Sequence, residues 1–566
     1  MHLFDWLILG LFVVYTLWDG LRHQHGSKDL EGMFLAGRSM PWWAMGLSVM
    51  ATQASAITLI GTTGQAFAED MRFVQVYLGL PIAVVILCIT LVPFYHRLRV
   101  FTIYETLEER FGLSTRLVTS GLFLISRGAS LGIVIAAPAY ILALILEWPF
   151  ERTIWVIGTF ATIYTMFGGI TGVIRTDVKQ MVLMMIGLAA CFGWLWKSLP
   201  DEVGMHQAME LAGMSGKLQS IDFHFDPAEK YNFWSGLVAG LFLMLSYFGA
   251  DQSQVQRYLT ARSLTDARFS LILSGIAKIP MQFVILLFGA LLYVHFVFSE
   301  SPLVFLPDAS PPQSVCVDEV SANQLWQQRR DAAMAWAHDP KAPQNRNQYL
   351  HSDQQYQQCR QREMRRMQQQ HDKFHKDTNF VFPHFVLHVL PKGLTGLLVA
   401  AILAAALSSI DSLLNSLTTS TMIDWWQRLA PQKRSDTFYL WASRGITFLW
   451  GLFATLTAIA FGQTESIVEV INQVGSYFYG PILGVFLLLW VPRVRGKTAL
   501  IALLIGMGVV LTFGTWYHSC GGGETAFFFP FGQHPDGFRP RISYLWLNPI
   551  GTFTVLLVGL LGRRRS

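Results

Sequence analysis

Residues 399–426, VAAILAAALSSIDSLLNSLTTSTMIDWW, form a mainly apolar stretch long enough to cross a bilayer, with an acidic residue near its middle. A helix through this stretch places four polar residues, at positions i, i+3, i+4 and i+7, on one face: Ser408, Asp411, Ser412 and Asn415. Ser409 lies beside that face. A carboxylate inside an apolar span is costly unless a cation neutralises it, and hard cations prefer oxygen ligands. The stretch therefore predicts a cation site around Asp411, with a seam of interhelical hydrogen bonds as the alternative.

The composition of the chain agrees with a protein built from such stretches. Of its 566 residues, 52% are hydrophobic and only 14% are charged, whereas about a quarter of the residues in a soluble domain are charged. The charges cluster between apolar segments of about 20 residues, the length that a helix needs to cross a membrane. Because lipid offers no hydrogen-bond partners to the backbone, these segments are expected to be helices. The net charge of +5 requires no nucleic-acid partner, since the basic residues lie mainly in connecting loops.

Thirteen spans can be drawn, which we number from zero to twelve. They cover residues 4–21, 43–66, 74–96, 117–147, 153–171, 177–197, 232–256, 268–298, 393–426, 438–461, 467–491, 498–516 and 546–562. The first span lacks the basic start and the small-residue cleavage site of a secretory signal, so it is expected to remain in the protein. The sequence thus predicts an all-α integral membrane protein with about 13 transmembrane helices.

Basic residues concentrate in alternate short loops between the spans, and this bias sets the orientation of a membrane protein. The residues counted on the basic side include Arg38, Arg97, Arg116, Lys179, Arg257, Arg262, Lys433 and Arg493. The basic side should face the cytoplasm, which places the N-terminus outside and the C-terminus in the cytoplasm. We therefore expect a multi-pass protein of the cell (cytoplasmic or inner) membrane.

The segment 299–380 separates two spans and is long, polar and rich in Gln, Arg and His. Its length exempts it from the charge bias, and it is expected outside, as a solvated helix or helical hairpin that caps the spans. An isolated regulatory domain is the alternative. Cys316 and Cys359 could pair there, because the outer compartment is oxidising. Cys520 is a third candidate, and the sequence does not choose between the pairings.

Two further spans carry polar residues at mid-depth. The span at 43–66 contains a run of small and polar residues: Ala51, Thr52, Gln53, Ala54, Ser55, Ala56 and Thr58. Such a run suits close helix packing, but packing does not require the bulky amide of Gln53. An interrupted helix, whose free carbonyls could bind a cation, would explain the run. The span at 232–256 contains Tyr247 followed by several glutamines, and Tyr247 is the stronger functional candidate.

Two isolated charges have two interpretations each. Asp177, with Gln180 three residues later, could cap a helix N-terminus or supply a second cation carboxylate. Arg127 could extend toward the cytoplasmic surface, or it could face a cavity and hold an anionic substrate. The residues alone leave both questions open.

Familiar catalytic motifs are missing from the sequence. It contains no phosphate-binding loop of the form G-x-x-x-x-G-K-[ST], which argues against transport driven by ATP. It contains no H-E-x-x-H or C-x-x-C, which argues against a zinc hydrolase or a dithiol redox enzyme. The sequence predicts neither an enzyme nor a bound cofactor.

Six motifs are spread over the chain. They are FLAGRSMPWWAMGLSVMATQASAITLIG (34–61), YETLEERFG (104–112), GIVIAAPAYIL (132–142), GGITGVIRTDVKQ (168–180), YFGADQSQVQRYL (247–259) and LSSIDSLLNS (407–416). Together they resemble the sodium:solute symporters, relatives of the sodium/glucose, proline, sialic acid and iodide carriers. The resemblance implies the LeuT-type fold, in which two inverted repeats of five helices enclose the site, with extra helices at both ends. It also implies transport by alternating access.

On that fold the chain would divide into seven parts. These are an N-terminal extra helix with a cytoplasmic loop (1–42), the first inverted repeat (43–198), an outer loop (199–231), the start of the second repeat (232–298), the outer insertion (299–392), the rest of the second repeat (393–492) and the C-terminal extra helices (493–566). The insertion departs from the compact pattern of the family.

The resemblance also implies ion sites, carried over by motif. The main sodium site would use three carbonyls and two hydroxyls: those of Ala51, Ala54 and Ala405, with Ser408 and Ser409. A second cation site, occupied only in some members, would match Asp177, Asp411 and Ser412 together with Ser408. The sugar carriers have a hydroxyl residue where this sequence has Asp411, so the extra carboxylate should strengthen that site or carry a proton.

The implied function is sodium-coupled import of a small solute through a lipid bilayer, with sodium as coupling ion and no obligate protein partner. The candidate substrate residues are Gln53, Thr58, Arg127 and Tyr247. Ile57 and Thr58 stand where the sugar carriers place hydrogen-bonding side chains, which disfavours a sugar. With Arg127, the likeness to the monocarboxylate, vitamin and iodide branch favours a small organic anion. A sugar or other neutral solute is the alternative, and a transporter-like membrane sensor is an alternative of a different class.

Overall fold

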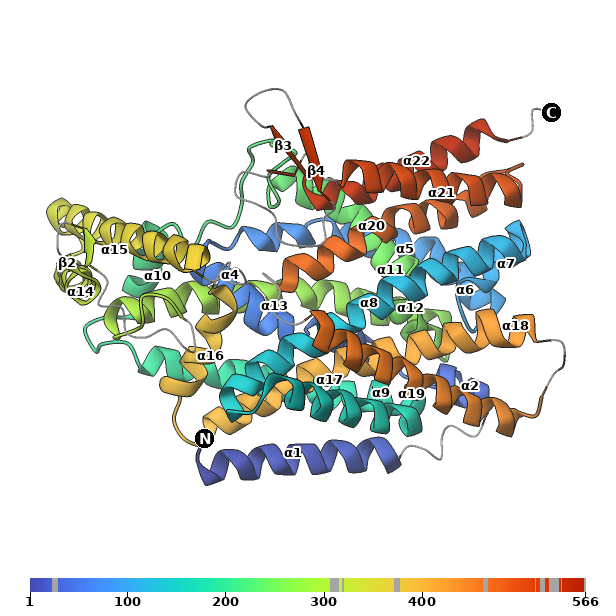
Figure 1. The fold of residues 1–566 in the computed structure, drawn as a ribbon, viewed down its shortest axis with the longest axis horizontal. Helices are drawn as coiled ribbons and strands as arrows, with labels where there is room; N and C mark the ends of the chain where they lie inside the picture. The colour runs from blue at the N-terminus through green and yellow to red at the C-terminus, as the bar shows by residue number, and fades with distance from the viewer. Residues whose placement is uncertain are drawn as a thin grey trace.

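The computed structural model describes residues 1–22, 29–305, 315–317, 320–370, 377–430, 432, 434–461, 467–514, 516–519, 525–528, 539–540 and 542–563. Over these residues the chain forms a bundle of long helices that run in roughly one direction (Figure 1). Ten of the described helices are long and apolar enough to cross a membrane, and the number is eleven when one bent pair is counted as a span. The chain is therefore a multi-pass membrane protein, and the number of thirteen spans stays a prediction.

The elements follow one another in a simple order. The helices of the first half are α1 (Leu3–Arg22), α2 (Leu30–Leu35), α3 (Trp42–Gln53), α4 (Thr63–Ala68), α5 (Leu80–Ile89), α6 (Leu91–Leu98), α7 (Glu105–Phe111), α8 (Leu113–Leu146), α9 (Phe150–Lys197), α10 (Met205–Met214), α11 (Gly240–Gly249), α12 (Gln252–Leu259) and α13 (Leu264–Phe298). Those of the second half are α14 (Ala322–His338), α15 (Pro343–Gln370), α16 (Thr378–His388), α17 (Leu394–Ser420), α18 (Gln427–Leu429), α19 (Asp436–Phe461), α20 (Ile467–Leu487), α21 (Gly496–Phe513) and α22 (Leu547–Leu561). The described strands form two small antiparallel sheets: β1 (Val315–Val317) with β2 (Val320–Ser321), and β3 (Trp516–Ser519) with β4 (Thr525–Phe528) and β5 (Arg539–Pro540).

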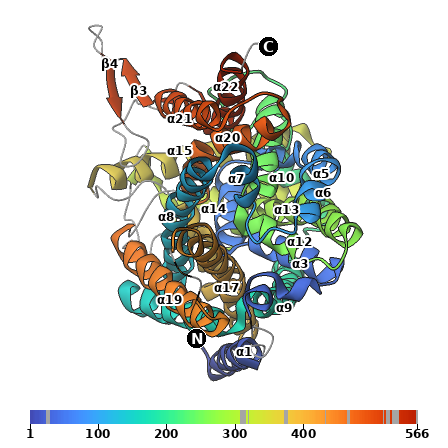
Figure 2. The ribbon, with the colours of Figure 1, turned by 90° about the vertical axis from the view of Figure 1, so that its right-hand side faces the viewer.

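Helix α17, which contains Asp411, lies at the centre of the bundle. It packs against α9, α8, α3 and α19. Figure 2, seen from the end opposite α14 and α15, shows it enclosed by neighbouring helices. All its side chains from 398 to 420 are buried. The Asp411 carboxylate therefore faces protein on every side and not lipid.

Helix α9 covers both of the spans expected at 153–171 and 177–197. Its 48 residues are two helices that meet at a kink. The helix is kinked at Gly169, whose φ of 55° and ψ of −168° are not helical. Because glycine adopts a positive φ at little cost, the chain turns within this residue and needs no loop.

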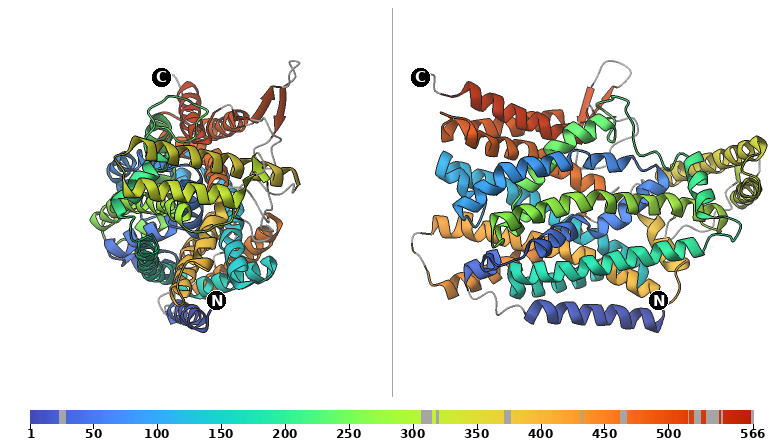
Figure 3. Two further views of the ribbon diagram at one scale, coloured as in Figure 1. Left: turned by 90° about the vertical axis from the view of Figure 1, so that its left-hand side faces the viewer. Right: turned by 180° about the vertical axis from the view of Figure 1, so that it is seen from behind.

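The inserted segment forms a helical hairpin at one end of the bundle. Helices α14 and α15 pack against each other, and this hairpin, here called the cap (Ala322–Gln370), lies across the ends of the membrane helices (Figure 3, left). The cap is not solvated on all sides, because Arg329 and Asp353 are buried and form an ion pair with 2.7 Å between Nε and Oδ1. The Tyr293 hydroxyl of α13 donates to Asp353 Oδ1 at 2.6 Å, so the cap is anchored to a membrane helix.

A disulfide involves the cap. Cys359 of α15 is disulfide-bonded and buried, whereas Cys88 and Cys191 are free thiols within the membrane helices. Its partner is one of the two remaining cysteines, Cys316 and Cys520, whose side chains lie outside the described residues. The strand β1, which contains Cys316, contacts α15, and this proximity favours the pairing of Cys316 with Cys359.

Gly64 of α4 lies directly against the backbone that begins α16. A Cβ atom added at Gly64 would lie 1.8 Å from the Thr378 carbonyl oxygen, and no side-chain rotation can relieve a clash with backbone. We expect Gly64→Ala to lower the midpoint of thermal unfolding, because an overpacked site costs about 1–3 kcal/mol. Intrinsic fluorescence of the purified protein during heating would measure the change.

Gly508→Ala in α21 is the matched control for this prediction. No atom lies within 4 Å of a Cβ added there, and alanine is a better helix former than glycine. The Gly508 variant should therefore keep or slightly raise the midpoint. Equal midpoints for the two variants would contradict the close packing of α4 on α16.

Candidate functional site

A broken helix runs beside α17 through the centre of the bundle. Helix α3 ends at Gln53, and Ala54 has a ψ of 55°, outside the helical range. The chain resumes at the π-helical turn Thr58–Thr62 and continues as α4, bent by 59° from α3. The Gln53 carbonyl accepts hydrogen bonds from the Thr58 hydroxyl at 3.1 Å and from Lys278 Nζ at 3.3 Å. The helix interruption expected from the sequence is present, and the two side chains satisfy the Gln53 carbonyl that has lost its helical partner.

Two serine hydroxyls of α17 meet carbonyl oxygens at the end of α3. Ser408 Oγ lies 2.9 Å from the Ala51 carbonyl oxygen, and Ser409 Oγ lies 3.1 Å from that of Thr52. Both hydroxyls are also 3.3 Å from the Ala405 carbonyl oxygen. These oxygens, here called the oxygen cluster, belong to buried residues and are all neutral. Neutral hydroxyl and carbonyl oxygens at a helix break are the ligands that membrane transporters offer to sodium.

Four of the five residues expected to bind sodium are thus brought together, and the Thr52 carbonyl joins them. Ala54, the fifth, lies at the break itself. None of the described hydrogen bonds links its carbonyl to the two serines.

The residues of the expected second cation site also meet. Asp177 of α9 and Asp411 of α17 are both fully buried. The Ser48 hydroxyl donates to Asp177 Oδ2 at 2.5 Å, and the Tyr164 hydroxyl donates to Asp411 Oδ2 at 2.6 Å. Ser412 Oγ lies 3.2 Å from Asp411 Oδ1. Two carboxylates therefore belong to one buried polar cluster beside the oxygen cluster.

A guanidinium group lies within this acidic cluster. Arg257 of α12 is 1% exposed, and its Nη2 lies 3.7 Å from Asp177 Oδ2. Its Nε donates to Ser48 Oγ at 2.9 Å. Its Nη2 donates to Thr52 Oγ1 at 2.7 Å and to the Ser412 hydroxyl. Arg257 thus supplies positive charge where the sequence predicted a second free cation.

Two expectations about this cluster are corrected. The sequence counts Arg257 among the loop charges, but every residue of α12 is buried, because the polar side chains of this helix find hydrogen-bond partners on α17. Gln256 Nε2, for example, donates to Asn415 Oδ1 at 2.8 Å. Asp177 lies well inside α9, so it does not cap a helix N-terminus.

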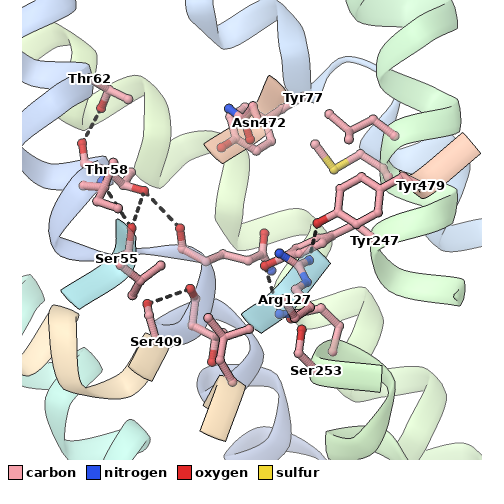
Figure 4. Close-up of a pocket in the computed structure, with 18 of the residues that line it drawn as sticks. Ser55, Thr58, Thr62, Tyr77, Arg127, Tyr247, Ser253, Ser409, Asn472 and Tyr479 are labelled. Atoms are coloured by element: carbon pink, nitrogen blue, oxygen red, sulfur yellow. Dashed lines mark hydrogen bonds between the residues drawn. The ribbon is translucent and has the colours of Figure 1, made fainter. Parts of the chain in front are cut away.

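A cavity of about 150 Å³ lies next to the break. Its walls include all four candidate substrate residues: Gln53, Thr58, Arg127 and Tyr247 (Figure 4). Other polar residues of the wall are Ser55, Thr62, Tyr77, Ser253, Gln254, Asn472 and Tyr479. Thr52 and Ser409 line the cavity as well, so this central cavity and the oxygen cluster share two residues.

Arg127 faces the central cavity as one half of an ion pair. Its Nε donates to Asp251 Oδ2 at 2.6 Å, and its Nη2 donates to the Tyr479 hydroxyl. Its guanidinium carbon lies 5.4 Å from the centroid of the Tyr247 ring and 5.1 Å from that of Tyr479. Arg127 is 5% exposed. The structure therefore excludes an arginine that extends to the surface, and it places the side chain at the cavity wall.

Sequence reasoning did not assign roles to Lys278 and Tyr479. Lys278 of α13 is fully buried, and its Nζ lies 5.2 Å from the centroid of the Tyr77 ring. A lysine within an apolar span is itself a functional signal, and it could have been found that way. Tyr479 carries no such signal, because an aromatic residue in an apolar helix usually serves packing.

Comparison with known proteins finds relatives along most of the chain. The sodium:solute symporter family matches residues 33–326 and 371–506. The sodium-dependent multivitamin transporter of Oryctolagus cuniculus is 26% identical over an alignment that covers 99% of this chain and 82% of that protein. The sodium-coupled monocarboxylate transporter 2 of Bos taurus is 24% identical, over 89% of this chain and 69% of that protein.

A solved structure shares the whole fold. A Na⁺-coupled sialic acid symporter in its substrate-bound outward-open state superimposes with a TM-score of 0.75 and 22% sequence identity, over 99% of this chain and 97% of that chain. This likeness confirms the LeuT-type fold that the motifs implied.

Proposed function

This chain belongs to the sodium:solute symporter family and is a transporter, not an enzyme, and on that premise we propose that it carries a small organic anion, such as a monocarboxylate, together with sodium by alternating access. The observation that supports coupling is a shared wall: Thr52 and Ser409 line the central cavity and also belong to the oxygen cluster. An ion held by these residues would fix the wall against which the solute binds. Ion and solute would therefore favour the same conformation, which is what coupling requires.

We propose that the main sodium ion binds among the oxygens of the oxygen cluster, with the Ala54 carbonyl as a further ligand at the break. The Ser408 and Ser409 hydroxyls now donate to carbonyls. A hydroxyl that rotates its proton away offers its lone pairs to a cation. Sodium would thus replace two hydrogen bonds by direct contacts with the same oxygen atoms.

At the second cation position, we propose that Arg257 takes the place of an ion in the described conformation. Asp177, Asp411 and Ser412 would accept a second sodium ion only when the guanidinium withdraws. When Asp177 and Asp411 are both ionised, Arg257 neutralises one of the two negative charges, and the cluster keeps a net charge of about −1. That net charge favours a sodium ion at the adjacent Ser408.

The chemistry of the central cavity supports an anion. Arg127 lines the cavity, and Lys278 contacts the carbonyl of the cavity residue Gln53. Apolar side chains complete the wall: Ile57, Phe73, Val134, Leu243, Met244 and Leu413. A short carboxylate with an apolar body would satisfy both kinds of surface. The ring of Tyr247, which faces the Arg127 guanidinium, would cover the bound solute on the side of α12.

A neutral solute is the second candidate, and one observation favours it. Asp251 already neutralises Arg127, so an anion would have to compete with a buried carboxylate for the guanidinium. Hydroxyl and amide groups around the cavity would serve a neutral polar solute as well.

We propose that the protein lies in the cell membrane with its N-terminus and the cap outside. The start of α1 lies at the cap end of the bundle, and α22 ends at the opposite end (Figure 1). Together with the basic loops, this arrangement supports a cytoplasmic C-terminus.

Uptake into proteoliposomes tests the proposal. The purified protein would be reconstituted and given radiolabelled lactate, benzoate, glucose or proline, with an inward gradient of sodium or, as the control, of potassium. We expect a carboxylate to accumulate above its outside concentration only with the sodium gradient. Accumulation of glucose or proline alone would establish the neutral alternative, and uptake that ignores sodium would refute sodium coupling.

A further inference from the structure

A second cavity, of about 180 Å³, lies beneath the cap. Its walls come from the end of α4, from α13 and from both cap helices, and they include Phe67, Tyr293, Arg329, Tyr356, Arg360 and Gln361. Among the residues described, none lines both this cap cavity and the central cavity. The space could hold roughly ten water molecules or one small organic molecule.

Arg329 of α14 lines this space and has a hydrogen-bond donor without a partner. The side chain is 2% exposed, and it forms an ion pair with Asp353 in which Nε lies 2.7 Å from Oδ1 without the geometry of a hydrogen bond. Its Nη2 likewise has no hydrogen-bond partner among the described residues. Leaving a donor of a buried charged group unpaired costs free energy, and native structures rarely do so without a ligand or a water to accept it. The missing partner of Arg329 is therefore an acceptor.

The charges around the cap cavity favour an acceptor that is negative. Arg360 donates to both oxygens of Asp377, at 2.7 and 2.8 Å, so this pair is balanced. Asp353 balances Arg329. Lys217 is buried as well, and among the described residues its Nζ donates to two carbonyl oxygens, those of Ala68 and Glu69 at 2.8 and 3.2 Å. Burial lowers the pKa of Lys217 to about 8, so the lysine is still mainly charged at pH 7.

The rest of the wall is aromatic. The guanidinium carbon of Arg329 lies 4.8 Å from the centroid of the Tyr293 ring and 4.7 Å from that of Tyr356. Phe67 and Phe305, whose ring centroids are 5.5 Å apart, face the same cavity. An apolar body would pack on these rings while a carboxylate reached the guanidinium. Glu69, the remaining acidic residue of the wall, is exposed to solvent.

We propose that the cap cavity is a second binding site, which takes a small carboxylate with an apolar body and holds it through Arg329 Nη2. This goes beyond the transport site, because the cap residues 327–370 lie between the two ranges that match the family. Binding at the cap cavity needs no sodium, since the oxygen cluster belongs to the other cavity.

Binding of radiolabelled benzoate to the full-length protein in detergent, in potassium buffer without sodium, tests this site. We expect saturable binding by the wild type, with no competition from the neutral isostere benzamide. Gln361→Glu adds a negative charge at the exposed wall of the cavity and leaves every buried ion pair in place. Because the added carboxylate would repel a carboxylate bound in the same cavity, it should weaken binding about tenfold.

Gln358→Glu is the matched control, since Gln358 is exposed on the same helix but does not line the cavity. It should bind as the wild type does. Arg329→Gln should abolish binding where the variant folds. Absence of sodium-free benzoate binding to the wild type, or equal affinity of the Gln361 and Gln358 variants, would overturn the proposal.

The double variant Ser408→Ala, Ser409→Ala separates this site from the transport site. It should retain sodium-free benzoate binding in full. Loss of that binding in the double variant would assign the benzoate to the central cavity and overturn the cap site, whatever the uptake experiment shows.

Discussion

Replacing Ser408 and Ser409 together by alanine is expected to reduce sodium-driven uptake to the level of empty vesicles. The two hydroxyls contact three backbone carbonyls at the helix break, those of Ala51, Thr52 and Ala405. A hydroxyl that contacts an ion contributes about 1.5–3 kcal/mol, so losing two would lower sodium affinity by a factor of about 10² to 10⁴. Initial uptake rates at a series of sodium concentrations would show this loss.

Ser416→Ala is the matched control for this double variant. Ser416 is a buried serine of the same helix, and its hydroxyl donates to the Leu413 carbonyl of its own helix at 2.9 Å. Its loss should leave the sodium dependence unchanged. Gel filtration would confirm that each variant is folded. Normal uptake with normal sodium affinity in the double variant would show that the ion binds elsewhere.

Replacing Arg257 by glutamine is expected to make the thermal stability of the protein strongly dependent on sodium. Without the guanidinium, Asp177 and Asp411 share a buried cluster that contains no basic side chain among the described residues that contact it. Removing one partner of a buried ion pair costs about 3–5 kcal/mol. A sodium ion that enters the vacated position would recover part of this cost by mass action. Thermal unfolding with and without sodium, at constant ionic strength, measures both effects.

Arg262→Gln provides the comparison for Arg257. Arg262 is an exposed residue a few positions later, in an i,i+4 ion pair with Asp266, and surface pairs of this kind contribute about 0–1 kcal/mol. Its loss should change the midpoint little and should not alter the sodium response. If the Arg257 variant also lacked an enhanced sodium response, the second cation position would have to be abandoned.

The oxygen cluster could be predicted from the sequence because each of its two halves is visible locally. Adjacent serines beside Asp411 interrupt the apolar pattern of one helix, and small polar residues around Gln53 mark the break in another. The resemblance then paired the two segments. The sequence of neither segment, taken alone, predicts that the Ser409 hydroxyl donates to the Thr52 carbonyl.

The contacts that the sequence did not reveal join residues far apart in the chain. Arg127 pairs with Asp251, 124 positions away, and neither residue alone indicates that the other is its partner. Arg257 follows a polar run, where a basic residue usually marks the membrane surface. Its burial depends on how α12 packs against α17, which is a tertiary property. The burial of Arg329 likewise depends on the docking of the cap.

The attachment of the cap has a thermodynamic consequence for transport. Arg360 holds Asp377 at the start of α16, and the next residue, Thr378, presses on Gly64 of α4. If binding under the hairpin changes the affinity for the solute through these contacts, the solute changes the affinity of the hairpin site by the same factor. Turnover would then respond to the composition of the medium bathing the hairpin as well as to the ion gradient, a form of control that relatives without this insertion would lack.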